Sequence, residues 1–427
     1  MSFDFLKDDS FFNIIIRDPV WKDISFTPEF IEITRSEPFL RLYRIRQLGP
    51  TELVYPGATH TRAAHSLGVY HLSLRILKVL ALRGADSWIT EIGSKSFLAA
   101  ALLHDLGHFP YTHSLKELPL LDHEQLTARI ILIDPLPKLL TKAGANPEMT
   151  AAIVDHMTIT QDVEILFFRK LLSGVLDPDK LDYLNRDASY CGVPYGIQDT
   201  DFIISKLQCD KNRGIIIDSS AIMSIESILF SKYLMYRSVY WNRQVRIATA
   251  MMKKALYGAL TTKLVLPEEL YPLDDPGIHQ IFEKIDSPYS DLTEQIRSRK
   301  FFKIVAEYPF NESDKGMIEL ENLEKRTDME RELAEKVSII TGMKVSSEQV
   351  LIDIPERISF ESDLYIFDEK KNFNESSTVF NQSLVNRFTQ SLRKLRIAVT
   401  PIVEQKLFEI PDITEKLANY IHVDYTK

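Results

Sequence analysis

A long apolar run that ends on titratable side chains is the feature of this sequence that most constrains its fold. The segment "SKSFLAAALLHDLGH", residues 94–108, predicts a buried helix stopped by Gly107 and Pro110. His104 and Asp105 come at its last turn, where two adjacent side chains can both reach a centre just beyond the helix end. Imidazole nitrogen and carboxylate oxygen are normal ligands for a divalent first-row metal. The pattern therefore indicates a buried helix that delivers ligands to a polar site.

Other histidines and acidic residues could complete that site. Seven of the ten histidines fall within residues 60–123, and His65 lies early in a second predicted helix. Asp179 opens a third predicted helix that has one polar and one apolar face. Two histidines and two carboxylates would hold a divalent cation and leave one or two positions for water and a phosphate oxygen. The four candidate ligands are His65, His104, Asp105 and Asp179.

Each of these features also has a purely structural explanation. An HD dipeptide is common by chance, and one histidine could simply cap its helix while the others are solvated. The polar face of the third helix could likewise be solvated; it carries Asp179, Tyr183, Arg186 and Asp187 at i, i+4, i+7 and i+8. The combination of the motifs, and not any one of them, therefore carries the metal hypothesis.

Composition restricts the class of protein. The 427 residues are 45% apolar and 26% charged, which is typical of a globular chain with a large core. A net charge of −9 argues against a broad nucleic-acid footprint. No apolar run approaches the roughly 18 residues that a membrane span needs, and the acidic start lacks the basic residues of a signal peptide. Cys191 and Cys209 are too few for a disulfide framework. We expect a cytoplasmic protein without a membrane or strong nucleic-acid partner.

The spacing of apolar residues predicts a mainly α protein. Helices are expected over residues 28–48, 61–83, 94–108, 123–133, 147–157, 162–173, 179–190 and about 220–262. Strand signals occur at 213–219, 349–355, 363–368 and 395–401, with a helix over 377–392. We therefore predict a helical body over residues 1–310 and a smaller C-terminal α+β region over residues 311–427.

The motifs around the candidate ligands resemble a known family. They are similar to those of the HD-domain deoxynucleoside triphosphate triphosphohydrolases related to the mammalian SAM-and-HD-domain dNTPase, and we expect no preceding SAM domain here. The resemblance implies an HD-type fold in which a metal assists the attack of water on the α-phosphorus of a dNTP. The products would be a deoxynucleoside and inorganic triphosphate. The motifs are "QLGPTELVYPGATHTRAAHSLGVYHL" (47–72), "LLHDLGHFPYTHSL" (102–115), "DHEQ" (122–125) and "LDPDKLDYLNRD" (176–187).

The resemblance also implies roles for individual residues. The four candidate ligands match the family's metal site, which would hold Mg, Mn, Fe, Zn or Ni. His108 and His123 match the histidines beside the α-phosphate, where an acid–base or charge-stabilising group is needed. The family also implies a homo-oligomer, either a dimer or a tetramer. The substrate contacts match Arg62, Lys180 and Arg237 for the triphosphate, Tyr183 and Asp187 for the sugar, and Gln47 and Leu48 beneath the deoxyribose.

The sequence departs from the family pattern at three places. Lys116 stands where the family has an acidic residue that orients a catalytic histidine, so Glu117 or Glu124 would have to take that role. Val245 stands where a tyrosine stacks on the substrate in the mammalian-type enzyme. The tract "RSEPFLRLYRIRQLG" replaces the second arginine of the family's guanine-nucleotide regulatory site with Tyr43. A regulatory site of that kind is therefore not supported.

Two other functions remain open. The chain could be an HD phosphohydrolase that acts on another nucleotide or a phosphomonoester, or a non-catalytic regulator that binds a metal and a nucleotide. The set of Arg62, Lys180 and Arg237 favours a triphosphate, because a single phosphate would not need three cations. Lys116 is the feature that keeps the regulator hypothesis open.

Overall fold

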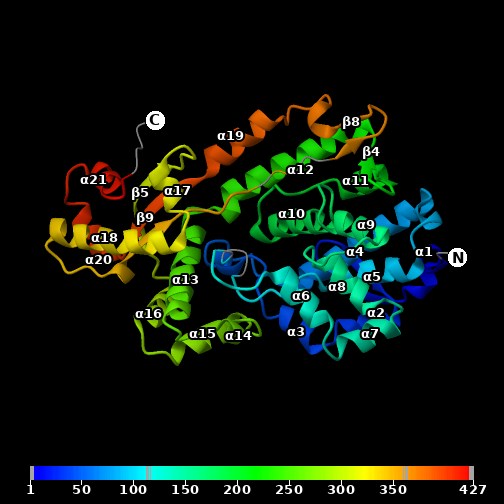
Figure 1. Cartoon of the computed structure of the whole chain (residues 1–427), viewed down its shortest axis with the longest axis horizontal. Coiled ribbons are helices and arrows are strands. Elements are labelled where there is room, and N and C mark those ends of the chain that lie inside the picture. The colour runs from blue at the N-terminus through cyan, green and yellow to red at the C-terminus, as the bar shows by residue number, and fades with distance from the viewer. Residues whose placement is uncertain (1–3, 112–114, 116, 359, 361–363, 423–427) are drawn as a thin grey trace.

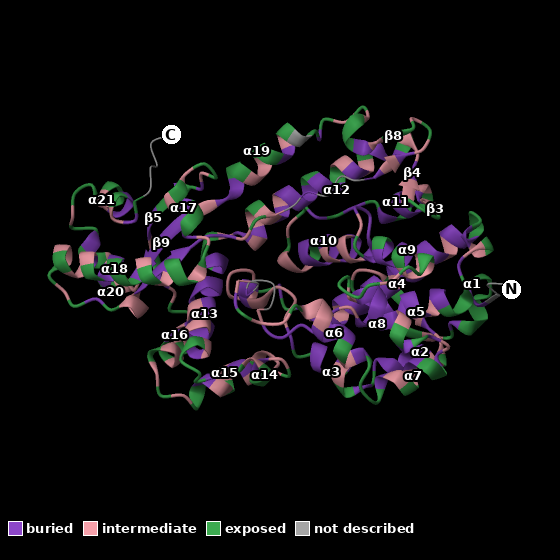
Figure 2. Ribbon diagram, viewed as in Figure 1, coloured by how far each residue is buried: buried purple, intermediate pink, exposed green. Residues whose placement is uncertain are grey.

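Apolar helices form the centre of the molecule. The structure is a computed structural model that describes residues 4–111, 115, 117–358, 360 and 364–422. The bundle helices are α4 (Arg62–Leu82), α5 (Glu91–Leu103), α8 (Pro147–Val154), α9 (Val163–Leu172) and α10 (Pro178–Cys191). The helix α4 packs on α5 and α10, and α8 packs on α5 and α9. Figure 2 shows many buried residues in this bundle. A mainly α fold is confirmed.

The N-terminal part of the chain differs from the prediction. The expected helix over residues 28–48 is two short helices, α2 (Pro28–Ile33) and α3 (Glu37–Leu42). Ser36 caps α3 in an extended conformation and Pro38 follows in its first turn, so a continuous helix cannot form. An antiparallel hairpin of β1 (Ile14–Asp18) and β2 (Lys22–Phe26) was not predicted. The remaining short helices around the bundle are α1 (Asp4–Lys7), α6 (His123–Ile131), α7 (Leu136–Lys142) and α11 (Thr200–Lys206).

The predicted long helix over residues 220–262 is also wrong. It is divided into α12 (Ile222–Met235) and α13 (Arg243–Thr261) by a π-helical turn, Tyr236–Tyr240. Asn242 then caps α13 by accepting a hydrogen bond from the Gln244 amide. Figure 1 shows that α13 runs steeply across the direction of α12. The amphipathic pattern continues through the break, which is why periodicity alone did not locate it.

A second lobe forms around a three-stranded antiparallel sheet in the order β5–β9–β6. This sheet and four helices enclose a second apolar core. A third core joins the lobe to α13 and to a helical extension below it. The strands are β5 (Lys303–Pro309), β6 (Val350–Asp353) and β9 (Lys394–Val399). The helices are α17 (Lys315–Glu319), α18 (Leu323–Thr341), α20 (Pro401–Leu407) and α21 (Ile413–Tyr420); the extension has α14 (Pro267–Leu270), α15 (Asp275–Glu283) and α16 (Pro288–Arg297).

The chain beyond residue 310 does not stay within this lobe. β7 (Tyr365–Ile366) pairs in parallel with β4 (Gly214–Ile217), in a small sheet completed by β3 (Gln208–Asp210) and β8 (Lys371–Asn372). The helix α19 (Gln382–Leu392) then lies along α12, where the rings of Phe388 and Tyr233 stack at 4.3 Å. The division into residues 1–310 and 311–427 stays a prediction, and part of the second segment lies in the core of the body.

No helix in the described residues combines the length and the apolar character that crossing a bilayer requires.

Candidate active site

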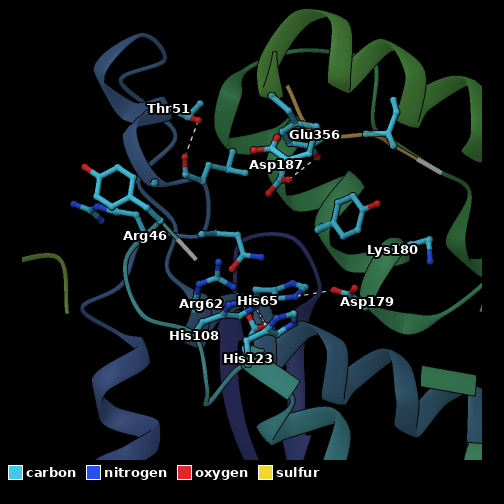
Figure 3. Close-up of a pocket in the computed structure, with 18 of the residues that line it drawn as sticks. Arg46, Thr51, Arg62, His65, His108, His123, Asp179, Lys180, Asp187 and Glu356 are labelled. Atoms are coloured by element: carbon cyan, nitrogen blue, oxygen red, sulfur yellow. Dashed lines mark hydrogen bonds and ion pairs between the residues drawn. The ribbon is translucent and has the colours of Figure 1, made fainter. Parts of the chain in front are cut away.

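A cavity of about 490 Å³ opens beside the end of α5. Its wall combines residues from α4, α6, α10, the π-helical turn and α13 with the segment 356–358 from the second lobe. Figure 3 shows His65, His108 and His123 close to one another, with Asp179 beside them. The cavity is therefore built jointly by the helical body and the second lobe.

Three of the predicted metal ligands form one cluster. Ligand atoms of His65, His104 and Asp179 all lie within 4.8 Å of one another. The Asp179 Oδ1 atom is 2.9 Å from His65 Nε2 and 3.9 Å from His104 Nε2. These distances are close enough for one cation to contact all three side chains after small movements.

The imidazole rings of the cluster are already oriented for a cation. His65 Nδ1 donates to the Asp182 carboxylate at 2.8 Å, and His104 Nδ1 donates to the Ala101 carbonyl at 2.9 Å. Because both partners are acceptors, each ring carries its proton on Nδ1 and presents Nε2 to the cluster. Among the described residues, the buried His104 Nε2 has no hydrogen-bond partner. A divalent cation fits this donor set.

The electrostatics of the cluster also favour a positive charge. Burial disfavours the charged imidazolium, yet the hydrogen bonds that His65 donates to Asp179 and Asp182 raise its pKa to about 10. A proton on His65 Nε2, which faces Asp179 at 2.9 Å, would take the place where a cation would otherwise bind.

Asp105, the fourth predicted ligand, lies beside the cluster. Its Oδ1 atom is 3.3 Å from His104 Nε2 and 3.0 Å from His108 Nε2, while Oδ2 accepts from Arg62 Nη1 at 2.8 Å. Burial opposes ionisation, but these neighbouring positive charges hold the pKa of Asp105 well below its usual range. Asp105 is therefore an anionic group shared by the cluster, a histidine and an arginine.

The two predicted catalytic histidines lie face to face. The rings of His108 and His123 stack with centroids 4.1 Å apart, and both line the cavity with Glu124. His108 does not lie on α5, as the predicted helix over residues 94–108 implied, because the helix ends at Leu103. It reaches the cavity from the loop that follows.

Glu117 lies elsewhere. Its carboxylate is 2.8 Å from Lys253 Nζ and 3.0 Å from Arg326 Nη2, so it joins the loop after α5 to α13 and α18. Burial opposes its ionisation, but the two cations lower the pKa of Glu117. Glu117 is not among the described residues that line the cavity, so an orienting role is not favoured by its position. His113 and Lys116 lie outside the described residues.

Only some of the lysines and arginines that line the cavity are those predicted from the sequence to bind the triphosphate. Arg62 pairs with Asp105, and Lys180 Nζ lies 2.7 Å from Asp177 Oδ2. Arg237 is exposed and does not line the cavity, whereas the buried Lys232 does. The role of Arg237 stays a prediction, and Lys232, which lines the cavity, was not singled out from the sequence. The four-residue spacing of Lys232, Tyr236 and Tyr240, which puts them on one face, was the available signal.

The predicted sugar contacts line the same cavity, and Figure 3 shows Asp187 apart from the three labelled histidines. Asp187 is fixed by His60 Nε2 at 2.8 Å and by the Tyr240 hydroxyl at 2.6 Å. The ring of Tyr183 stands edge-on to Tyr240 at 6.5 Å. Gln47, Leu48, Trp241 and Val245 also line the cavity.

Two assignments on α10 need correction. Arg186 was expected on the polar face with Asp179, but it is fully buried and pairs with Asp182 and Asp18. Asp182 was not singled out, although it holds the ring of His65. Its position three residues after Asp179 in a helix was the only signal in the sequence.

Comparisons with known proteins agree with this geometry. Residues 62–185 match the HD domain, and residues 198–394 match the HD associated region. The uncharacterized protein YwfO of Bacillus subtilis is 32% identical over 343 residues, which cover 74% of this chain and 77% of YwfO. The chain belongs to the family of HD-domain proteins that carry an HD associated region.

More distant relatives have named activities. The human deoxynucleoside triphosphate triphosphohydrolase SAMHD1 is 24% identical over 394 residues, which cover 80% of this chain and 62% of the human protein. A crystal structure of a phosphohydrolase from Bacteroides thetaiotaomicron matches with a TM-score of 0.71 and 26% identity, covering 91% of this chain and 99% of that one. A hypothetical protein from Aquifex aeolicus gives the same TM-score at 27% identity, with coverages of 96% and 99%. These relatives support a phosphohydrolase.

Proposed function

We propose that this protein hydrolyses deoxynucleoside triphosphates to deoxynucleosides and inorganic triphosphate in a metal-dependent reaction. One observation carries the proposal. The cluster of His65, His104 and Asp179 opens into the same cavity as Asp187 and Tyr183, which match the sugar contacts of the family. A molecule that spans the cavity can thus meet a metal at one end and a hydroxyl-binding carboxylate at the other.

Different residues of the cavity would have different roles in the proposed reaction. A bound divalent cation would polarise a phosphoryl oxygen and lower the pKa of a bound water. Arg62, Lys180 and Lys232 would hold phosphate oxygens through charge-assisted hydrogen bonds. His108 and His123 would hold or move a proton beside the α-phosphate, with Asp105 orienting the His108 ring through Nε2.

The charge of the wall explains why a metal is needed. Its described part carries as many carboxylates as lysines and arginines, so the fixed charges balance formally. A triphosphate brings up to four negative charges, and a cation at the ligand cluster would offset part of them. The cationic residues are Arg46, Arg62, Lys180, Lys232, Arg246 and Arg357; the carboxylates are Asp105, Glu124, Asp177, Asp179, Asp187 and Glu356.

The sugar end supports a preference for deoxyribose. Tyr183 would close over the 2′ position, and Asp187 and Gln47 would hold the 3′-hydroxyl. Gln47 Oε1 is buried and lacks a partner among the described residues, so it is available as an acceptor. A site built to pair a hydroxyl discriminates strongly against its absence, so dideoxynucleotides should be poor substrates.

The test is a screen of the purified protein against all dNTPs and NTPs with Mg²⁺ and Mn²⁺, with inorganic triphosphate measured directly. We expect release of triphosphate from dNTPs and little from NTPs. An Asp105→Asn variant should lose turnover, whereas Asp201→Asn, at an exposed ion pair with Arg75, should match the parent.

Other outcomes would contradict the proposal. Equal turnover of GTP and dGTP would exclude the deoxyribose site. Turnover of another phosphate ester would indicate a different HD phosphohydrolase, and binding without turnover would indicate a regulator. We also propose, from the family resemblance, that the protein is a homo-oligomer, which sedimentation velocity would test.

A further inference from the structure

A buried network of charges lies behind the ligand cluster, on the side away from the cavity. At its centre is Asp182, whose side chain is fully buried. Its carboxylate accepts hydrogen bonds from His65 Nδ1 at 2.8 Å, from Trp21 Nε1 at 2.5 Å and from Arg186 Nε at 2.8 Å. Both carboxylate oxygens are therefore engaged, and the group has little freedom to turn.

The N-terminal hairpin of β1 and β2 also contributes residues to this network. Arg186 Nη1 lies 2.8 Å from Asp18 Oδ2. Asp18 Oδ1 in turn accepts from the backbone amides of Val20 and Trp21 at 2.9 and 2.8 Å, which fixes the turn between β1 and β2. The same turn thus presents two groups to the network, a carboxylate for Arg186 and an indole for Asp182.

The helix α4 leaves space for these groups. Gly68 lies one turn after His65, and a Cβ atom built there would be 1.8 Å from Asp182 Oδ1 and 2.5 Å from Arg186 Nη2. Any side chain at this position would push the carboxylate away from the backbone of α4. The glycine therefore permits the close approach that brings Asp182 to the ring of His65.

We propose that Asp182 and Trp21 are positioning residues for the metal ligand His65, and that the N-terminal hairpin thereby sets the metal affinity of the site. The inference rests on the metal centre of the proposed function, but on no particular substrate. Partners that fix the second nitrogen of a ligating imidazole hold its ring in place, and their loss typically costs about 10- to 100-fold in metal affinity. Here the partner, Asp182, is itself held by Trp21, which lies 161 residues earlier in the chain.

The first test measures metal affinity without a nucleotide. Asp182→Asn keeps the shape of the side chain but removes its charge, and we expect about tenfold weaker binding of Zn²⁺ or Mn²⁺ in a competition titration. Asp201→Asn is the matched control, because Asp201 also pairs with an α4 side chain, but at the surface. A folded Asp182→Asn protein with the affinity of the parent would overturn the inference.

The second test observes the network in the parent protein and uses variants only to assign resonances. The chain has three tryptophans, so an ¹⁵N spectrum has three indole resonances, which Trp21→Phe and Trp88→Phe would assign. On titration with diamagnetic Zn²⁺, the Trp21 resonance should move in step with metal occupancy. The Trp88 resonance, whose ring packs on Phe167, should stay in place. An unshifted Trp21 resonance at full occupancy would overturn the inference.

The results of these two tests can be distinguished from a failure of the proposed dNTP hydrolysis. Both experiments measure metal binding alone. The expected results can therefore be obtained even if the protein hydrolyses no dNTP, and they can be absent even if it is a dNTP triphosphohydrolase.

Discussion

At the scale of single residues, Lys232 and Arg237 offer a sharp contrast. They lie five residues apart on the same helical segment, yet Lys232 is buried in the cavity wall and Arg237 is exposed. Arg237 Nη1 donates to the Tyr233 hydroxyl at 3.0 Å, away from the lining. The two side chains have the same charge and differ in position, so a comparison of their variants tests which of them contacts a phosphate.

Lys232→Met should therefore raise KM for dNTPs, while Arg237→Met should leave it within about twofold. A hydrogen bond to a charged group contributes about 1.5–3 kcal/mol, which corresponds to roughly 10- to 150-fold in binding. Steady-state kinetics on both variants checks this. The reverse result, with Arg237→Met impaired and Lys232→Met normal, would restore the assignment made from the sequence.

Sequence reasoning succeeded where chemistry is local and failed where it depends on packing. His104 and Asp105 are adjacent at a helix end, so their shared site could be predicted from the chain alone. Asp182 could not be predicted, because its role depends on a contact between α4 and α10 and on a hairpin that periodicity missed. The position of Glu117 outside the cavity could not be predicted either, because Lys253 and Arg326, its partners, come from helices far along the chain.

At the scale of elements, one turn of α4 contains two small residues, Gly68 and Ser66, whose substitution should affect stability differently. Gly68 faces Asp182 and Arg186 at distances that leave no room for a methyl group. Ser66 is also fully buried, but its hydroxyl has no hydrogen-bond partner among the described residues. A buried hydroxyl without a partner carries a desolvation cost. The packing of α4 therefore requires that Gly68 has no side chain, whereas the hydroxyl of Ser66 contributes little to stability.

Gly68→Ala should lower the free energy of unfolding by about 1–3 kcal/mol, the usual cost of overpacking. Ser66→Ala should leave it unchanged or slightly raised, because it removes an unpaired polar group. Denaturant unfolding of the two variants at equal metal concentration checks the difference. A Gly68→Ala protein as stable as the parent would show that Asp182 can move without cost.

The loop after α5 is tied to two helices by Glu117, and this tie depends on pH. The cations beside it lower the pKa of Glu117 in the native state below the ordinary value of 4.5. A lowered native pKa means that the ion pairs stabilise the fold fully above about pH 4.5. Their contribution is lost as the pH falls through the native pKa.

Glu117→Gln should therefore lower the free energy of unfolding at pH 7 by about 1–3 kcal/mol. The difference from the parent should shrink as the pH drops below about 4.5. Urea unfolding at several pH values measures this. If turnover instead falls 100-fold with unchanged stability, Glu117 has the orienting role that the sequence suggested.

At the scale of the whole molecule, a metal should stabilise the fold, since its ligands come from three different helices or helix ends. His65 lies on α4, His104 at the end of α5 and Asp179 on α10. A ligand that binds only the native state adds about 2.7 kcal/mol to the free energy of unfolding at 100 times its Kd.

Removal of divalent metal by a chelator should therefore lower the Tm, and added Mn²⁺ or Zn²⁺ should restore it. The His104→Ala variant should show a much smaller response in the same thermal scans. An equal metal response in the parent and in His104→Ala would place the stabilising cation elsewhere.

The parallel pairing of β4 with β7 has a consequence for how the molecule holds together. The backbone passes from the body to the second lobe after α12, returns to pair at Ile216 and Ile217, and leaves again after α19. The described parts of the chain therefore connect the two halves three times, and described residues on both sides of each connection lie in an apolar core. A protease that nicks one crossing would not release a fragment. The nicked protein would run as two bands on a denaturing gel and as one species on a sizing column.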